Sequence, residues 1–216
     1  MRNTMSSVAP AFIAVLLFSA AGRAQEGDGA RLLSRLREKY NDVDRLSLTF
    51  AQKTVFAVSK AEQVTEGKLV LGKGNQYRIT LGDRLIVSDG RTVWSMSKSN
   101  SQVIVDRFRD DPSGITPERL LARLPEDYRA VSTGTEKIGR IRTTVLKLTP
   151  GSPGGQVKWL KLWVDEDEMA VRRLVVMDLG ENEITYDLGD VTVDPDVPDS
   201  VFTFTAPAGT EILDLR

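Results

Sequence analysis

Histidine and cysteine, two residue types that often carry out chemistry in proteins, are missing from this chain. Its 216 residues include no histidine and no cysteine. This composition excludes Ser-His and Cys-His nucleophilic arrangements, metal sites built on imidazole or thiolate ligands, disulfides, and lipid attachment to an N-terminal cysteine. Carboxylates, lysines and hydroxyls remain, and no spacing among them indicates a catalytic site. We therefore expect a protein that is not an enzyme and that uses no cofactor.

The charge balance argues against nucleic acid as a partner. The chain has 29 Lys and Arg against 30 Asp and Glu, for a net charge of −1 at pH 7, and the charges are interspersed. Proteins that bind nucleic acid usually carry a basic patch or stripe, because phosphate neutralisation supplies most of the affinity. This sequence has no such stripe.

The first residues have the features of a secretory signal peptide. Arg2 provides a basic start, and residues 11–21 form an apolar segment. That segment is shorter than the roughly 20 residues of a membrane-spanning helix, and Arg23 closes it, so a membrane anchor is the less favoured interpretation. Small residues follow, and cleavage is expected after Ala24 or Gly22. We therefore expect residues 1–24 to be a signal peptide and residues 25–216 to form one domain.

Two segments are predicted to be helical. Residues 30–40 place Leu32, Leu33, Leu36 and Tyr40 on one stripe, with Asp28 as the expected N-cap. Residues 110–127 are predicted as a loop followed by a short helix, because Thr116 suits an N-cap and Pro117 suits the first helical position. The apolar face of this second helix would consist of Leu120, Leu121 and Leu124.

Most of the remaining chain alternates apolar and polar residues with a period of two, which is typical of half-buried strands. Asp89-Gly90 between two such runs predicts a hairpin with a type I′ turn. In one later strand Leu160 and Leu162 share a face, and Trp159 and Trp163 lie on the opposite face. The predicted strands are 46–51, 66–72, 76–81, the two arms of 85–94, 102–107, 129–138, 140–149, 157–165, 170–178, 183–193 and 201–205.

These elements predict a mainly β protein with a few helices. Strands that are close in sequence and joined by short turns favour one long antiparallel sheet. A sheet with so few helices must pack on a second sheet or curl. If it curls and the helices cover its concave face, an apolar pocket results.

The order of several short motifs resembles the LolA family. The strongest is Leu85 to Trp94, which reads L-I-V-S-D-G-R-T-V-W. The resemblance extends from about Leu32 to Ile212. Its other anchors are Phe50-x-Gln52, Gly67-x-Leu69-x-Leu71, Gln102-Val103, Leu120-Leu121, Leu148-x-Pro150, Asp178 with Gly180, and the closing F-x-F-x-x-P-x-G pattern of residues 202–209.

The resemblance implies an unclosed half-barrel with a helical lid over an apolar cavity. It implies a monomeric periplasmic carrier that takes acylated lipoproteins from an inner-membrane ABC transporter to an outer-membrane receptor such as LolB. Residues expected to line the cavity are Phe50, Leu69, Leu71, Tyr77, Ile79, Trp94, Leu120, Leu121, Leu124, Leu160 and Leu162. For each of them, ordinary packing in the core of the sheet is the competing interpretation.

One position departs from the family pattern. The family commonly has Arg-Pro after the Gly-x-Leu strand, and that arginine is associated with lid closure. Here Lys73-Gly74 occupies the aligned positions. Lysine keeps the charge but lacks the planar guanidinium group that forms two parallel hydrogen bonds. Lys73 is therefore a candidate lid latch whose role stays open.

Two other functions remain as alternatives. A protein of this family could bind another lipid or a glycolipid, or could act as a sensor domain for mislocalised lipoproteins. A lipid or glycan hydrolase is the least favoured hypothesis, because the chain has neither His nor Cys.

Overall fold

The computed structural model describes residues 18–41, 43–109, 128–152 and 155–216. Within these residues the strands form one twelve-stranded sheet that is accompanied by one α-helix and one 3₁₀ helix. The elements are α1 (Phe18–Asn41), β1 (Leu46–Val55), β2 (Glu62–Leu71), β3 (Gln76–Leu81), β4 (Arg84–Asp89), β5 (Thr92–Ser97), β6 (Gln102–Arg107), β7 (Tyr128–Ile138), β8 (Ile141–Pro150), β9 (Val157–Asp165), β10 (Ala170–Asp178), β11 (Glu183–Val193), η1 (Asp199–Phe202) and β12 (Glu211–Asp214).

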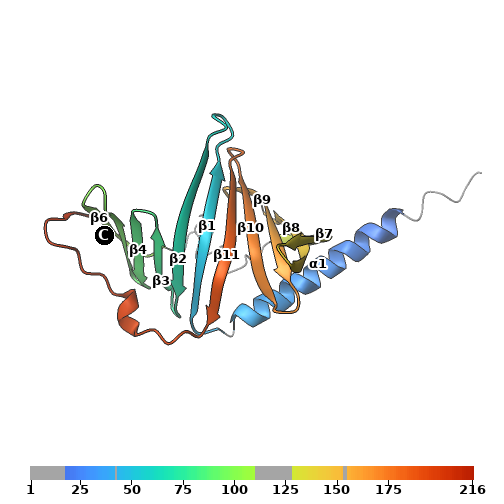
Figure 1. Ribbon diagram of the computed structural model, residues 1–216, viewed down its shortest axis with the longest axis horizontal. Coiled ribbons are helices and arrows are strands. Elements are labelled where there is room, and N and C mark those ends of the chain that lie inside the picture. The colour runs from blue at the N-terminus through green and yellow to red at the C-terminus, as the bar shows by residue number, and fades with distance from the viewer. Residues whose placement is uncertain (1–17, 42, 110–127, 153–154) are drawn as a thin grey trace, which may run out of the picture.

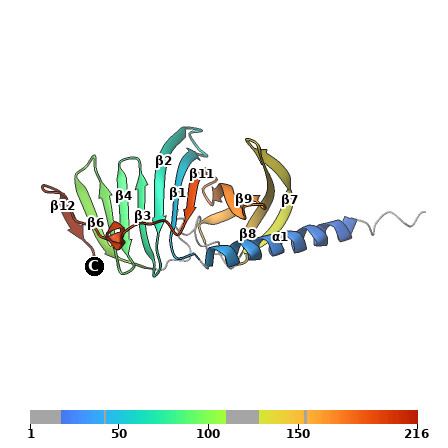
Figure 2. The same ribbon diagram turned by 60° about the horizontal axis from the view of Figure 1, so that its bottom comes forward.

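The sheet is curved and unclosed, as predicted. Its strand order is β12-β6-β5-β4-β3-β2-β1-β11-β10-β9-β8-β7, so β12 and β7 are its two edges. Figures 1 and 2 show the strands turning from the β12 edge round to the end where α1 lies. Most neighbours in the sheet are also neighbours in sequence, because short turns join them. In the middle of the sheet, β1 and β11 are far apart in sequence but pair antiparallel, and this pair joins the two halves of the sheet.

The C-terminal segment corrects two details of the prediction. Residues 201–205 are not a strand: Val201 and Phe202 belong to η1, which packs against β3 and β4. Phe202 is buried, and its ring lies beside Gly72. After this crossing, β12 pairs in parallel with β6. The sheet is therefore mixed rather than purely antiparallel. A tight turn can join only antiparallel neighbours, whereas a long crossing segment allows the next strand to pair in either direction.

Helix α1 is longer than predicted. It begins at Phe18 and runs through the expected cleavage region, so Asp28 lies inside the helix instead of capping it. The Asp28 carboxylate forms an ion pair with Arg31, one turn later. In the uncut chain the Ala-rich stretch before Asp28 is compatible with a helix and extends it toward the N-terminus. Figure 1 shows this first part of α1 projecting beyond the sheet, whereas its later part packs against β7. No helix in the described part of the chain is long and apolar enough to cross a membrane.

The predicted hairpin of Leu85 to Trp94 is present, but its turn is shifted by one residue. Asp89 ends β4, and its Oδ1 accepts hydrogen bonds from the backbone N–H groups of Arg91 (2.8 Å) and Thr92 (2.7 Å). Gly90 has φ of +92°, and a Cβ there would lie 2.2 Å from the carbonyl oxygen of Gly74. Asp89 itself does not adopt the positive φ of a type I′ turn. The glycine is thus needed both for the turn and for close contact with the β2–β3 turn.

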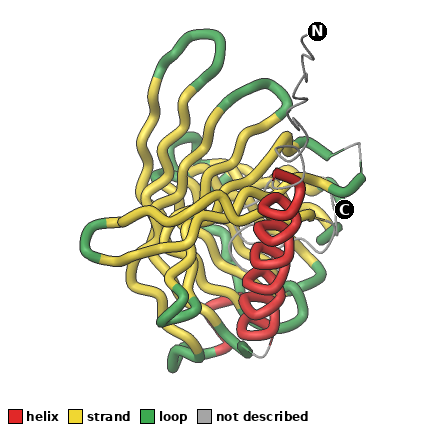
Figure 3. Tube along the Cα trace, turned by 90° about the vertical axis from the view of Figure 1, so that its right-hand side faces the viewer, coloured by secondary structure: helices red, strands yellow, loops and turns green. Residues whose placement is uncertain are grey.

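The sheet buries apolar side chains on both faces. The larger cluster lies on the face toward α1, where Leu32, Leu33 and Leu36 of the helix join residues from β1 to β3 and from β7 to β11. Figure 3 shows α1 lying along this side of the strands. We call this side the inner face. The opposite, outer face is covered in part by η1 and the residues that follow it.

Candidate lipid-binding face

The inner face brings together most of the predicted cavity residues that the structure describes. Phe50, Leu69, Tyr77, Ile79, Leu160 and Leu162 are all buried in its cluster, and Leu71 packs against that cluster half-buried. These side chains come from strands at both ends of the chain, and the β1–β11 pair joins them into one surface. Leu120, Leu121 and Leu124, the predicted lid residues, lie outside the described residues.

Phe50 lies at the middle of this face. Its register partner in β2 is Gly67, and a Cβ on Gly67 would lie 2.3 Å from Cζ of the Phe50 ring. On the other side the ring meets Tyr186 edge-on, with ring centroids 5.8 Å apart and an interplanar angle of 63°. Gly67 therefore provides the space in which Phe50 lies across the sheet, as glycine does where a close approach is needed.

Two ends of the inner face differ in how completely they are buried. At the α1 end, Leu146, Leu162, Leu174 and Val176 have no exposed surface. At the other end, the cluster is continued by half-buried side chains and then by Ile104, which is 38% exposed, and Leu213, which is 46% exposed. We call this the open end; it consists of Leu81, Ile86, Val93, Ile104, Phe108 and Leu213.

Strand register explains why these side chains share one face. Ile86 pairs with Ile79 of the buried cluster, and Ser95 pairs with both Ile86 and Ile104 across the next strands. Leu213 of β12 lies opposite Ile104. Because directly opposed residues point to the same side of a sheet, this chain of pairs extends the inner face from β3 to the β12 edge. The sequence prediction missed Ile86, Val93, Ile104 and Leu213, although the pairing of β3 with β4 would have identified the first of them.

The same register corrects the placement of Trp94. Its partners are Val87 and Val105, which lie on the outer face. The Trp94 ring stacks on Phe204 of the C-terminal segment, with centroids 6.0 Å apart and an interplanar angle of 23°. Trp94 is thus a packing residue of the outer face and does not line the inner face. Trp94 directly follows Val93 in β5, and successive residues of a strand point to opposite faces of the sheet.

Lys73 has a partner in the described structure. Its Nζ lies 2.5 Å from Oδ1 of Asp44, in the connection between α1 and β1, and both side chains are largely exposed. The contact ties the β2–β3 turn to the residues that follow the helix. An exposed pair of this kind contributes little to stability. Whether Lys73 acts as a lid latch stays a prediction.

The other predicted tryptophans lie on the outer face. Trp163 is buried with Val145 and Val175, and its Nε1 donates a hydrogen bond of 2.8 Å to Glu136. Trp159 packs against this small cluster, and two lysine ammonium groups lie over its ring within 6 Å. The strand therefore buries leucines on one side and a tryptophan on the other.

The chemistry available on the inner face is mainly apolar contact, because its large cluster is built from aliphatic and aromatic side chains. At the open end the register adds Ser88 and Asp106, which both pair with Val93. Polar residues also lie toward the β1–β2 turn, where Nε2 of Gln52 donates to Oγ1 of Thr54 over 3.3 Å. In the described residues no group of three carboxylates could hold a metal ion.

Among the described residues, a buried charge is found at Asp165, where β9 ends. Burial of Asp165 opposes its ionisation, but the Arg172 guanidinium donates two hydrogen bonds to Oδ2, at 3.1 Å and 2.6 Å, and backbone N–H groups bind Oδ1. The pKa of Asp165 is consequently lowered. The β9–β10 turn also meets the helix, because Nζ of Lys39 donates to the Glu168 carbonyl over 2.5 Å. Asp165 therefore serves the structure of the α1 end.

Comparison with known proteins identifies the family. Residues 41–205 match the family described as outer membrane lipoprotein carrier protein LolA. The chain belongs to the LolA family. An outer-membrane lipoprotein carrier protein of Shewanella sediminis is 29% identical over 220 residues, which cover 100% of this chain and 98% of that protein. One from Histophilus somni is 25% identical over 190 residues, covering 87% of this chain and 89% of that protein.

Solved structures agree on the fold of this LolA-family chain. An uncharacterised conserved protein from Thermus thermophilus superposes with a TM-score of 0.56 at 10% identity, over 86% of this chain and 98% of that one. LprF from Mycobacterium bovis superposes with a TM-score of 0.51 at 10% identity, over 85% and 98%. At such identity the likeness concerns the fold alone.

Proposed function

We propose that this LolA-family chain is a periplasmic carrier that binds the acyl chains of lipoproteins at the open end of the inner face. The observation that carries the proposal is the apolar cluster of the inner face, which is fully buried near α1 and is followed toward β12 by the partly exposed Ile104 and Leu213. The relatives named as outer-membrane lipoprotein carriers support the choice of cargo.

The apolar chemistry of this surface suits reversible binding. Removing a lipid chain from water yields about 0.8 kcal/mol per methylene. Complete burial of several chains would approach the upper limit of non-covalent affinity, and the cargo could not be released. Partial burial over Ile86, Val93 and Ile104, which already keep some exposure, gives an intermediate affinity.

The route is part of the same proposal. The N-terminal residues 1–24 would direct export to the periplasm and be removed there. An inner-membrane lipoprotein-releasing ABC transporter would load the carrier, and an outer-membrane receptor such as LolB would accept the cargo. Lys73 and the predicted helix with Leu121 would control access to the inner face, and the Leu121→Glu substitution is expected to abolish cargo retention.

Binding can be tested with a matched pair of substitutions. Ile104 on the inner face is 38% exposed, and Ile141 at the start of β8 is 36% exposed. Ile104→Asp places a carboxylate beside the bound chains and is expected to weaken binding of a fluorescent acyl probe at least tenfold. Ile141→Asp is expected to bind the probe as the unsubstituted protein does, and equal loss in both variants would contradict the proposal.

Cargo identity is tested by purifying the native protein from the periplasm and analysing the bound molecules by mass spectrometry. Triacylated lipoprotein is the expected finding. Free phospholipid or glycolipid alone would instead support the alternative of a LolA-like binder for another lipid.

A further inference from the structure

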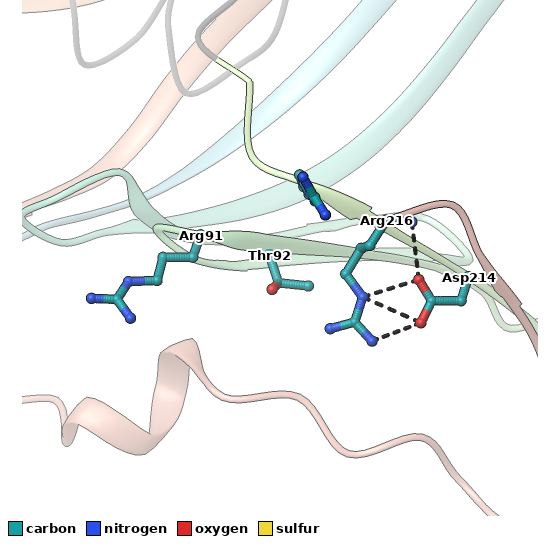
Figure 4. A pocket seen from close by; sticks show the side chains of 5 residues that line it. Arg91, Thr92, Asp214 and Arg216 are labelled. Carbon is teal, nitrogen blue, oxygen red and sulfur yellow. Dashed lines mark hydrogen bonds and ion pairs between the residues drawn. The ribbon is translucent and has the colours of Figure 1, made fainter.

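A second candidate site lies away from the inner face. Arg91, Thr92, Arg107, Asp214 and Arg216 line a pocket of about 600 Å³ that is wide open to solvent. Thr92 and Arg107 are directly paired across β5 and β6, in phase with Trp94 and Val105, so they belong to the outer face. Figure 4 shows Arg91 and Arg216 on either side of Thr92, with all three side chains on the same side of the strands. We call this site the arginine pocket.

The arginine pocket has more positive charge than its own contacts neutralise. Asp214 binds the Arg216 guanidinium through both carboxylate oxygens, at 2.6 Å to Nη2 and at 3.0 and 3.2 Å to Nε. Within the described residues, the guanidinium groups of Arg91 and Arg107 make no hydrogen bond or ion pair. The pocket thus holds three cations and one anion, in a chain whose total charge is −1.

Neighbouring acids do not supply the missing partners. Asp89 uses its Oδ1 to accept the backbone N–H groups of Arg91 and Thr92. Asp106 accepts the backbone N–H of Arg107 and lies 3.4 Å from Nη2 of Arg109. Guanidinium groups beside a hydroxyl form a set of donors suited to a phosphate group, because arginine matches phosphate oxygens with parallel hydrogen bonds.

The strand beside the arginine pocket exposes aliphatic side chains. Ile212 pairs with Val103 on the outer face and is 56% exposed, whereas Leu213 and Leu215, which are 46% and 51% exposed, alternate with it and belong to the side of the inner face. In the described residues β12 is an edge of the sheet, with β6 as its neighbour on one side. Cationic groups next to exposed aliphatic residues are the combination that binds an anionic membrane surface, where the cations meet phosphates and the apolar side chains enter the interface.

We propose that the arginine pocket binds the phosphate of an anionic phospholipid and that Ile212, on the same face of β12, rests in the lipid interface beside it. The inner face is on the opposite side of β5 and β6, so this site does not depend on the carrier function. It gives the protein a weak and salt-sensitive affinity for a membrane surface.

The test is flotation of the purified protein with vesicles of two compositions. One contains phosphatidylethanolamine and phosphatidylglycerol, and the other contains phosphatidylcholine in place of phosphatidylglycerol. Binding is expected only to the anionic vesicles. Arg91→Gln with Arg107→Gln is expected to weaken binding roughly thirtyfold, since each arginine near an anionic surface contributes about fivefold. Ile212→Ser is expected to weaken it by a smaller factor that does not vary with salt.

Matched controls separate this site from general charge and general apolarity. Arg140→Gln with Arg142→Gln removes two exposed arginines at the β7–β8 turn, and Val58→Ser removes a side chain that is 97% exposed at the β1–β2 turn. Both controls are expected to bind as the unsubstituted protein does. Equal loss in either control, equal binding to both vesicle types, or unchanged binding of the Arg91 and Arg107 variant would overturn the proposal. Binding of inorganic phosphate alone, measured by calorimetry, without binding of vesicles would also overturn it.

Discussion

The two ends of the inner face both carry apolar side chains but differ in burial. At the α1 end, Leu146, Leu162 and Leu174 belong to one cluster with the leucines of the helix, and these side chains have no exposed surface. At the open end, Ile104 and Leu213 keep 38% and 46% of their surface exposed. Apolar surface that is already buried stabilises the fold and has nothing further to gain from a ligand. The exposed part is what a lipid chain can cover.

The largest effect is expected at the α1 end. Leu162→Ala removes a fully buried side chain from the middle of three strands. The free energy of unfolding should fall by about 2–5 kcal/mol, because the vacated space cannot refill completely. Denaturant titration measures the change. Acyl-probe affinity below the unfolding transition should be nearly unchanged, and a large loss of affinity would mean that the ligand reaches this end as well.

The boundary between the two ends is tested at Gly67. Gly67→Ala places a methyl group within 2.3 Å of the Phe50 ring, so the ring must shift from its contact with Tyr186. We expect a loss of about 1–3 kcal/mol in the free energy of unfolding, as for other overpacked sites. Thermal unfolding followed by circular dichroism checks this, and Gly155→Ala, where φ is not positive and no atom lies within 4 Å of the added carbon, serves as a comparison without the steric clash.

A smaller change in stability is expected at the open end. Ile86→Ala truncates a half-buried side chain next to Ile79. The free energy of unfolding should fall by about 1 kcal/mol, since less area returns to water than at a fully buried site. The affinity for the acyl probe should fall by more than in Leu162→Ala. A loss of stability as great as that of Leu162→Ala would remove the distinction between the two ends.

The smallest effect concerns pH and again separates the ends. The pKa of Asp165 is lowered in the folded state because the hydrogen bonds from Arg172 and the backbone outweigh the effect of its burial. Its contribution to stability is present above the unfolded-state pKa of about 3.9 and is lost as the pH falls through the lower folded-state value. Denaturation midpoints between neutral pH and pH about 3 should show this loss. In Asp165→Asn that part of the pH dependence should disappear, whereas acyl-probe binding at the open end should not follow it.

Local patterns predicted most strands because their signals act over a few residues. Alternation placed Gln76–Leu81, Val157–Asp165 and Glu183–Val193 at the bounds that the structure shows. Residues 201–205 alternate in the same way, yet Phe202 packs into the outer face as part of η1. The short strand β12 has no periodic signal, since all four of its residues are exposed. Its existence depends on a partner more than a hundred residues away, which no local pattern can report.

The sequence by itself determined the class of the protein. The absence of His and Cys, the alternation of apolar residues and the order of the LolA motifs indicated an apolar binding protein built on one curved sheet. The tertiary structure alone decided which apolar residues face inward together, where Trp94 packs, and how Arg91, Arg107 and Arg216 meet at one edge. The reason is physical: alternation defines two faces for each strand, but only the pairing register and the crossing of the C-terminal segment assign those faces to the inside or the outside.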